Sequence, residues 1–201
     1  GSYNANNYLG RKRWDADWRQ WITDQYGSIA HAEELWGCKA PRNSAGQVIG
    51  LSDYNMDSPK ATESTMVAAY YRFMDDMIAK EFAELTNYIE VLDPNHLISF
   101  RMSMSGSALL SGEGKPSTGF YDFQSLASTM DFMSPEGYLI LNNEESMMQI
   151  VFANAYARYT SPNAPVVWKE FSWDVWNGSS FNVSQYNLEL EAKYYKLFLE
   201  H

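Results

Sequence analysis

Several features are scarce or absent in this chain of 201 residues, and each shortage excludes a class of protein. Cys38 is the only cysteine, which excludes an intrachain disulfide and a zinc site built from thiolates. The three histidines are scattered, so no metal site and no cofactor is predicted. No apolar run reaches the roughly 18 residues of a membrane span. Basic residues number 15 against 25 acidic ones, and the net charge of -10 disfavours nucleic acids and anionic membranes as partners.

Apolar and aromatic residues, by contrast, are plentiful. Apolar residues make up 45% of the chain, enough for the core of one ordinary domain, which we expect to span residues 1–198. Residues 199–201 read as the start of an affinity tag, so we do not expect the termini to be natural ones. Seven tryptophans and fourteen tyrosines either line a binding cleft for a neutral polar ligand or pack in the core.

Hydrophobic periodicity predicts helices that alternate with strands. Apolar residues recur at helical spacing over residues 15–36, where Gly27 interrupts and Gly37 closes two short helices. Pro59 begins a long amphipathic helix that ends before Pro94. The other predicted elements are a loop over 38–58, a strand over 97–103, a weak helix over 123–129, a strand over 131–136, a helix over 144–159, a strand over 166–171 and a last helix after Ser184.

This order of elements indicates an α/β fold. Strands that alternate with helices form right-handed crossover units and a parallel sheet. Long loops after the strands are typical of the active face of a (β/α)8 barrel, but only three strands are predicted here. The sequence therefore predicts either a small open α/β sheet or part of a barrel.

Several short motifs resemble one group of known enzymes. The motifs are Trp18-Arg-Gln-Trp, Glu34-Leu-Trp36-Gly37, Leu92-Asp-Pro-Asn-His96, Met133-Ser-Pro-Glu-Gly-Tyr138 and Val167-Trp-Lys-Glu170-Phe171. Over residues 14–198 they stand in the order found in the later part of the catalytic barrel of clan-A glycoside hydrolases. The similarity is to β-galactosidase, β-mannanase and cellulase-like members.

The resemblance implies a partial (β/α)8 barrel and a retaining mechanism that uses two glutamates. Residues 97–103, 132–136 and 166–171 then correspond to barrel strands five, six and seven, and Glu170 falls on the nucleophile. The acid/base, strands one to four and strand eight would lie outside this chain. We therefore expect a fragment of a catalytic domain that has little activity alone and whose parent acts on a poly- or oligosaccharide.

The residues around Glu170 support the same role without the resemblance. An apolar run from Pro165 ends on this glutamate. Val166, Trp168 and Glu170 are predicted to share one face of the strand. A carboxylate at the inward C-terminal end of a barrel strand meets substrate rather than solvent. On pattern alone, the alternative is a solvated or salt-bridged glutamate at a strand end.

Other polar and aromatic residues are candidate substrate contacts. Glu136 ends the neighbouring strand, where it binds sugar hydroxyls, has a structural role or acts as a second catalytic carboxylate; related enzymes commonly have a histidine near this point. Tryptophan faces stack on sugar rings, and arginine donates to hydroxyls. His96 is expected to be a structural hydrogen-bonding residue. The candidate substrate-binding residues are Glu136, Tyr138, Arg101, Trp168, Trp173 and Trp176.

Two other functions remain as alternatives. A noncatalytic carbohydrate-binding or scaffold module on a half-barrel would use the aromatic residues to bind glycan. A flavodoxin-like domain would need a glycine-rich phosphate turn, and Ser103-Met-Ser-Gly-Ser lacks the required spacing. Exposed sheet edges predict a homo-oligomer, and the sequence does not indicate a compartment.

Overall fold

The computed structural model describes most of the chain. The described residues are 14–51, 59–100, 123–134, 136–139, 161–168 and 170–173, together with residues 155, 158–160, 189, 192, 193 and 196, which are helical. The chain divides into two compact units, Gly1–Met77 and Ile78–His201.

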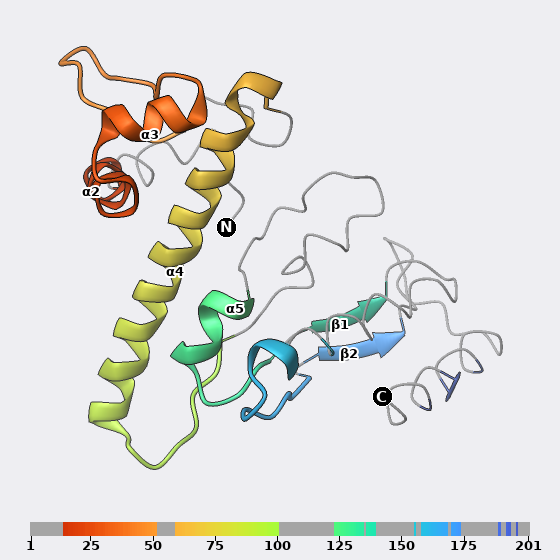
Figure 1. Cartoon of the computed structure of the whole chain (residues 1–201). Coiled ribbons are helices and arrows are strands. Elements are labelled where there is room, and N and C mark those ends of the chain that lie inside the picture. The colour runs from red at the N-terminus through yellow and green to blue at the C-terminus, as the bar shows by residue number, and fades with distance from the viewer. Residues whose placement is uncertain are drawn as a thin grey trace. The chain divides into compact units, whose positions relative to one another are not determined.

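The first helices described in the first unit are the two short helices that the sequence predicts (Figure 1). Helix α2 spans Asp15–Tyr26 and helix α3 spans Ile29–Trp36. Gly27 separates them with a φ of 77°, a backbone conformation that residues with a Cβ rarely adopt. The side chain of Ser28 then accepts a hydrogen bond from the backbone N–H of His31 at 3.1 Å and so caps α3.

The long helix is also confirmed. After a 3-10 turn over Ala61–Glu63, helix α4 spans Ser64–Leu92, and it ends just before Asp93 and Pro94. The boundary between the two units falls within α4, after Met77. Each half of this helix therefore contributes to the core of a different unit.

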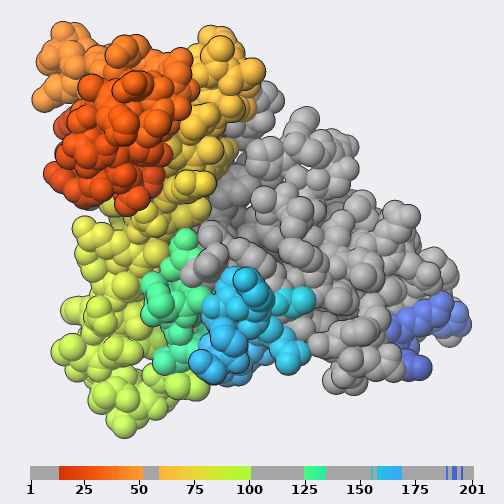
Figure 2. Space-filling view, in the orientation of Figure 1, coloured from red at the N-terminus to blue at the C-terminus, as the bar shows by residue number. Residues whose placement is uncertain are grey.

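The core of the first unit is built from aromatic side chains of α2, α3 and the first half of α4. In the space-filling view, the atoms of these segments, coloured red to yellow, lie against one another (Figure 2). Trp18 is fully buried, stacks on Trp36 with ring centroids 5.8 Å apart, and meets Tyr70 edge-on at 5.0 Å. Such aromatic pairs contribute about 0.5–1.5 kcal/mol each beyond their burial. Of the two roles considered for the tryptophans, lining a binding cleft and packing in the core, Trp18 and Trp36 therefore have the second.

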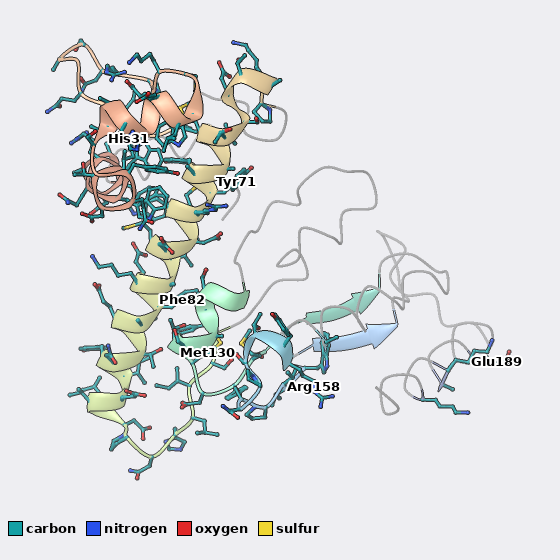
Figure 3. The ribbon with its side chains drawn as sticks, in the orientation of Figure 1. His31, Tyr71, Phe82, Met130, Arg158 and Glu189 are labelled. Atoms are coloured by element: carbon teal, nitrogen blue, oxygen red, sulfur yellow. The ribbon has the colours of Figure 1, made fainter. Side chains whose placement is uncertain are left out.

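The second unit packs the other half of α4 against a short helical segment. Helix α5 spans Phe123–Leu126 and continues as a 3-10 turn over Ala127–Thr129, which agrees with the weak helix predicted there. Leu126, Met130 and Met133 are buried, and Phe82, Phe100 and Val166 pack against them. Figure 3 shows Phe82 of α4 and Met130 on the facing sides of these two segments.

Two strands follow in the second unit. Strand β1 spans Glu136–Leu139, strand β2 spans Glu170–Trp173, and the two pair in parallel (Figure 1). An isolated parallel bridge joins Met133 to Val166 ahead of them. Its hydrogen bonds run from Met133 N–H to the Pro165 carbonyl at 3.0 Å and from Val167 N–H to the Met133 carbonyl at 2.8 Å.

The prediction of a partial (β/α)8 barrel with strands five to seven is wrong. The described residues are mainly helical, and the strands among them form a single two-stranded sheet. Residues 97–100 of the predicted first strand form no strand. The N–H and carbonyl of Ile98 bond to the side chain and backbone of Asp131, and a single residue held in this way does not establish a ladder.

Several predictions fall outside the described residues. These are the second part of the loop, 52–58, residues 101–103, most of the helix over 144–159, and Ser184 with most of the last helix. The domain limits and the assembly through sheet edges stay predictions. Among the described helices, none is both long enough and apolar enough to cross a membrane.

Candidate functional site

Glu136 and Glu170 are direct partners in the parallel ladder of the second unit. Each is the first residue of its strand, and the register pairs their Cα atoms. Neighbouring strands lie about 4.8 Å apart, and paired positions belong to the same face of a sheet. The structure therefore brings together the backbone positions of the two glutamates that the sequence singled out on separate strands.

The next pairs of the ladder contain two of the candidate aromatic residues, Tyr138 and Trp173. Tyr138 pairs with Ser172, two residues beyond the glutamates, and positions two residues apart in a strand belong to the same face. Trp173 pairs with Leu139, so alternation assigns this position to the other face. Position 138 thus lies on the face of the glutamate pair.

The other candidate substrate contacts are not gathered at this pair by the described residues. Trp168 is partly buried and lies between the bridge at Val166 and the start of β2. Arg101 and Trp176 lie outside the described residues. Their roles as sugar contacts stay predictions.

Three hydrogen bonds hold the segment that leads into β1. The carboxylate of Asp131 accepts the Ile98 N–H at 2.7 Å, and the Asp131 N–H donates to the Ile98 carbonyl at 2.9 Å. The hydroxyl of Thr86 on α4 donates to the carbonyl of Thr129 at 2.7 Å, and both residues are buried. Sequence reasoning missed these tethers, because a partner 33 or 43 residues away leaves no local signal.

The strongest electrostatic cluster belongs to the first unit. The buried carboxylate of Glu33 is 2.8 Å from Lys39 Nζ and 2.7 Å from Arg42 Nη2, and it accepts the Ala40 N–H at 3.0 Å. Burial by itself raises the pKa of Glu33, but these hydrogen bonds and the charge of Arg42 outweigh it, so the pKa lies below its ordinary value. The cluster fastens the start of the loop after α3, a structural role.

The lone cysteine does not have the environment of a reactive nucleophile. Burial, and then the charges of Glu63 and Glu33, raise the pKa of the Cys38 thiol. Reactive cysteines have lowered pKa values beside positive charges. Among the described residues, no group of three or more histidine, cysteine, aspartate or glutamate side chains is placed to hold a metal ion.

Comparison with known proteins identifies the class. Over residues 4–191 the chain matches a family model of glycoside hydrolases, the enzymes that hydrolyse O-glycosyl bonds. The match covers well over half of the 201 residues, and the chain therefore belongs to glycoside hydrolase family 42, described as beta-galactosidase. No curated protein and no solved structure matches the chain with significance.

Proposed function

We propose that this chain carries the nucleophile of a retaining β-glycosidase and that Glu170 is that nucleophile. The observation that carries the proposal is the register of Glu136 with Glu170 in a chain of a glycoside hydrolase family. Glycoside hydrolysis needs carboxylates on the face that meets the sugar, and like charges placed directly opposite in a sheet are destabilising. Two glutamates in register therefore lower the stability of the sheet, and a local loss of stability of this kind is expected at functional sites.

The proposed reaction is a double displacement. The carboxylate of Glu170 attacks the anomeric carbon, the bond to the leaving oxygen breaks, and a covalent glycosyl-enzyme forms that water then hydrolyses. The general acid of such a pair lies about 5–5.5 Å from the nucleophile. From the resemblance of the motifs we assign this acid to a glutamate outside these 201 residues. Glu136 then accepts hydrogen bonds from sugar hydroxyls beside the nucleophile.

The substrate class follows from the family description. We propose a β-galactoside, because the matching family is described as beta-galactosidase. A panel of aryl β-galactoside, β-mannoside and β-glucoside tests this choice. A preference for the mannoside or the glucoside would change the proposed sugar, whereas the assignment of Glu170 as nucleophile would stand.

Covalent trapping tests the nucleophile even without a general acid. A 2-deoxy-2-fluoro-β-galactoside with a dinitrophenolate leaving group needs no protonation to depart, and the fluorine slows breakdown of the glycosyl-enzyme. We expect the mass of the intact chain to rise by one fluorosugar, with the label on the peptide that contains Glu170. The variant Glu170→Gln is expected to remain unlabelled.

Matched variants test whether labelling depends on Glu170 itself or on any carboxylate at the surface of the chain. Glu136→Gln makes the same chemical change at the paired position and is expected to retain labelling at a reduced rate. Glu90→Gln makes it at an exposed position of α4 and is expected to label like the unaltered chain. Label on another carboxylate, or sugar binding without any label, would refute the assignment of Glu170; the second result would favour a noncatalytic carbohydrate-binding module.

A further inference from the structure

The second half of α4 exposes a group of apolar side chains to solvent. Most of the large apolar side chains that are exposed in the described part of the chain lie within residues 85–97. Single exposed apolar residues are common on protein surfaces, whereas a group of neighbours indicates a site of interaction. The members of this group are Leu85, Tyr88, Val91, Leu92 and Leu97.

Three of these residues form a strip along the helix. Leu85, Tyr88 and Leu92 follow one another at spacings of three and four residues, so they stand in one row on the surface of α4. Their exposed fractions are 43%, 64% and 67%. We call this row the apolar strip.

The apolar strip lies beside the face by which α4 packs within the second unit. Phe82 packs against the apolar cluster of this unit, and the buried Thr86 hydroxyl donates to the Thr129 carbonyl. At 3.6 residues per turn, Tyr88 stands about 160° around the helix axis from Thr86. In Figure 3, side chains on the last turns of α4 extend away from the α5 segment. The core of the unit therefore does not account for the strip.

The spacing of the strip favours a helix as its partner. Apolar residues that alternate at three and four residues are the a and d positions of a seam between two helices packed side by side. Leu85, Tyr88 and Leu92 then occupy a, d and the next a. The row is about 10 Å long, two turns of helix, and a strand has no matching period.

Two unpaired carboxylates border the strip at its N-terminal end. Glu81 precedes Leu85 by four residues, Glu84 precedes Tyr88 by four, and both are exposed. Among the described residues neither has an ion-pair partner, and no ion pair joins either of them to Lys80. Glu84 falls on position g, which forms ion pairs across such a seam. The border therefore favours a partner with positive charge.

We infer that the apolar strip is a docking surface for an amphipathic helix that carries lysine or arginine beside its apolar face. A second copy of the chain fits less well, because it brings a net charge of -10 and the same two unpaired carboxylates. The inference is independent of the proposed function, since neither Glu136 nor Glu170 belongs to the strip.

Two designed peptides test the chemistry of the partner. Each is a fluorescein-labelled helix of three heptads with leucine at a and d, and e and g are lysine in one peptide and glutamate in the other. Repulsion between like charges keeps each peptide from pairing with itself. By fluorescence polarisation at low salt, we expect the lysine peptide to bind about tenfold more tightly than the glutamate peptide. The difference is expected to shrink in 1 M NaCl.

Matched variants locate the binding. Leu85→Ser/Tyr88→Ser is expected to weaken binding of the lysine peptide at least about tenfold, because the buried apolar area is lost. Leu35→Ser/Tyr159→Ser makes the same changes at exposed positions off the strip and is expected to bind like the unaltered chain. Circular dichroism checks the helix content of each variant. If the double variant unfolds, Tyr88→Ala gives the same comparison with a strong helix former.

Exchanging the charges gives a further readout. Glu81→Lys/Glu84→Lys is expected to reverse the preference, so that the glutamate peptide binds more tightly. A lysine peptide of the same composition without the heptad pattern is expected to bind at least about tenfold more weakly than the patterned one, since the chain attracts cations everywhere at low salt.

Four results would overturn the inference. They are failure of both patterned peptides to bind, equal affinity for the two, equal binding of the unpatterned peptide, and binding that survives Leu85→Ser/Tyr88→Ser. Light scattering tests the competing occupant. Self-association that Leu85→Ser/Tyr88→Ser abolishes would assign the strip to a second copy and overturn the choice of a basic helix.

Discussion

Arg42 Nη2 lies 2.7 Å from Oε1 of Glu33, and only 3% of that glutamate side chain is exposed. Arg42 Nη1 also donates to the carbonyl of Ala40 at 2.8 Å, and the Ala40 N–H donates to the carboxylate at 3.0 Å. The arginine and the glutamate therefore hold the same short piece of backbone from two sides. This arrangement fixes the loop after α3 more firmly than an exposed ion pair would.

Neutralising Glu33 is expected to destabilise the first unit. Glu33→Gln keeps the shape and one acceptor but removes the charge that Lys39 and Arg42 face. Because both cations are partly solvated, we expect a loss of about 1–2 kcal/mol, below the 3–5 kcal/mol of a fully buried pair. Urea unfolding followed by tryptophan fluorescence measures the loss. Glu34→Gln, at an exposed neighbour, is the control, and an equal loss there would contradict this role for Glu33.

The same cluster predicts acid sensitivity. The pKa of Glu33 is lowered in the folded chain from an ordinary value of 4.5, so the unfolded chain binds more protons as the pH falls through this range. The contribution of Glu33 to stability is therefore fully present above pH 4.5 and is lost as the pH falls through the folded-state pKa. Urea midpoints measured from pH 6 to pH 2.5 are expected to fall less steeply in Glu33→Gln. Parallel slopes would refute the prediction.

Gly50 is expected to tolerate no side chain. A Cβ added there would lie 2.5 Å from the hydroxyl oxygen of the buried Tyr70, while the Gly50 N–H donates to Asp15 Oδ1 at 2.8 Å. We expect Gly50→Ala to destabilise the first unit by about 1–3 kcal/mol, the range for overpacking.

A double-mutant cycle isolates this clash. Tyr70→Phe removes the hydroxyl that the new Cβ would meet, so Gly50→Ala is expected to be milder in that background. Gly27→Ala is the control for backbone strain, since space is open there but φ is 77°. Additive losses for Gly50→Ala and Tyr70→Phe would show that the hydroxyl is not the obstacle.

In the second unit, Thr86→Val tests the tether between α4 and the segment before β1. The variant keeps the shape but leaves the buried Thr129 carbonyl without its donor at 2.7 Å. We expect a loss of about 1–2 kcal/mol. Hydrogen exchange is expected to quicken around Thr129 and to remain unchanged in α2 and α3. Uniform quickening in both units would contradict a local role.

Tyr138→Phe tests the predicted contact with substrate. Its position pairs with Ser172 on the face of Glu136 and Glu170. If its hydroxyl hydrogen-bonds the sugar, kcat/KM or the trapping rate falls about tenfold, near the 0.5–1.5 kcal/mol of one hydrogen bond. Tyr159→Phe, at an exposed tyrosine, is the matched control. An unchanged rate in Tyr138→Phe would remove this residue from the site.

Local patterns predicted the helices well, because a helix is specified by neighbouring residues. Gly27 ends α2, Ser28 caps α3, and Pro94 follows α4, each by a backbone preference that acts within one turn. The strands were predicted less well. The run over 166–171 has the apolar character of a strand, but regular pairing begins only at Glu170, where a partner segment more than thirty residues away comes into register.

The sequence by itself determined the helical elements, the family and the two glutamates that deserve testing. It did so because helix periodicity, caps and family motifs are written in consecutive residues. Only the tertiary structure decided that Glu136 stands opposite Glu170, that Trp18 and Trp36 are core, and that Asp131 and Ile98 bond to each other. These relations depend on which distant segments meet and in which register they pair, and no local pattern encodes either.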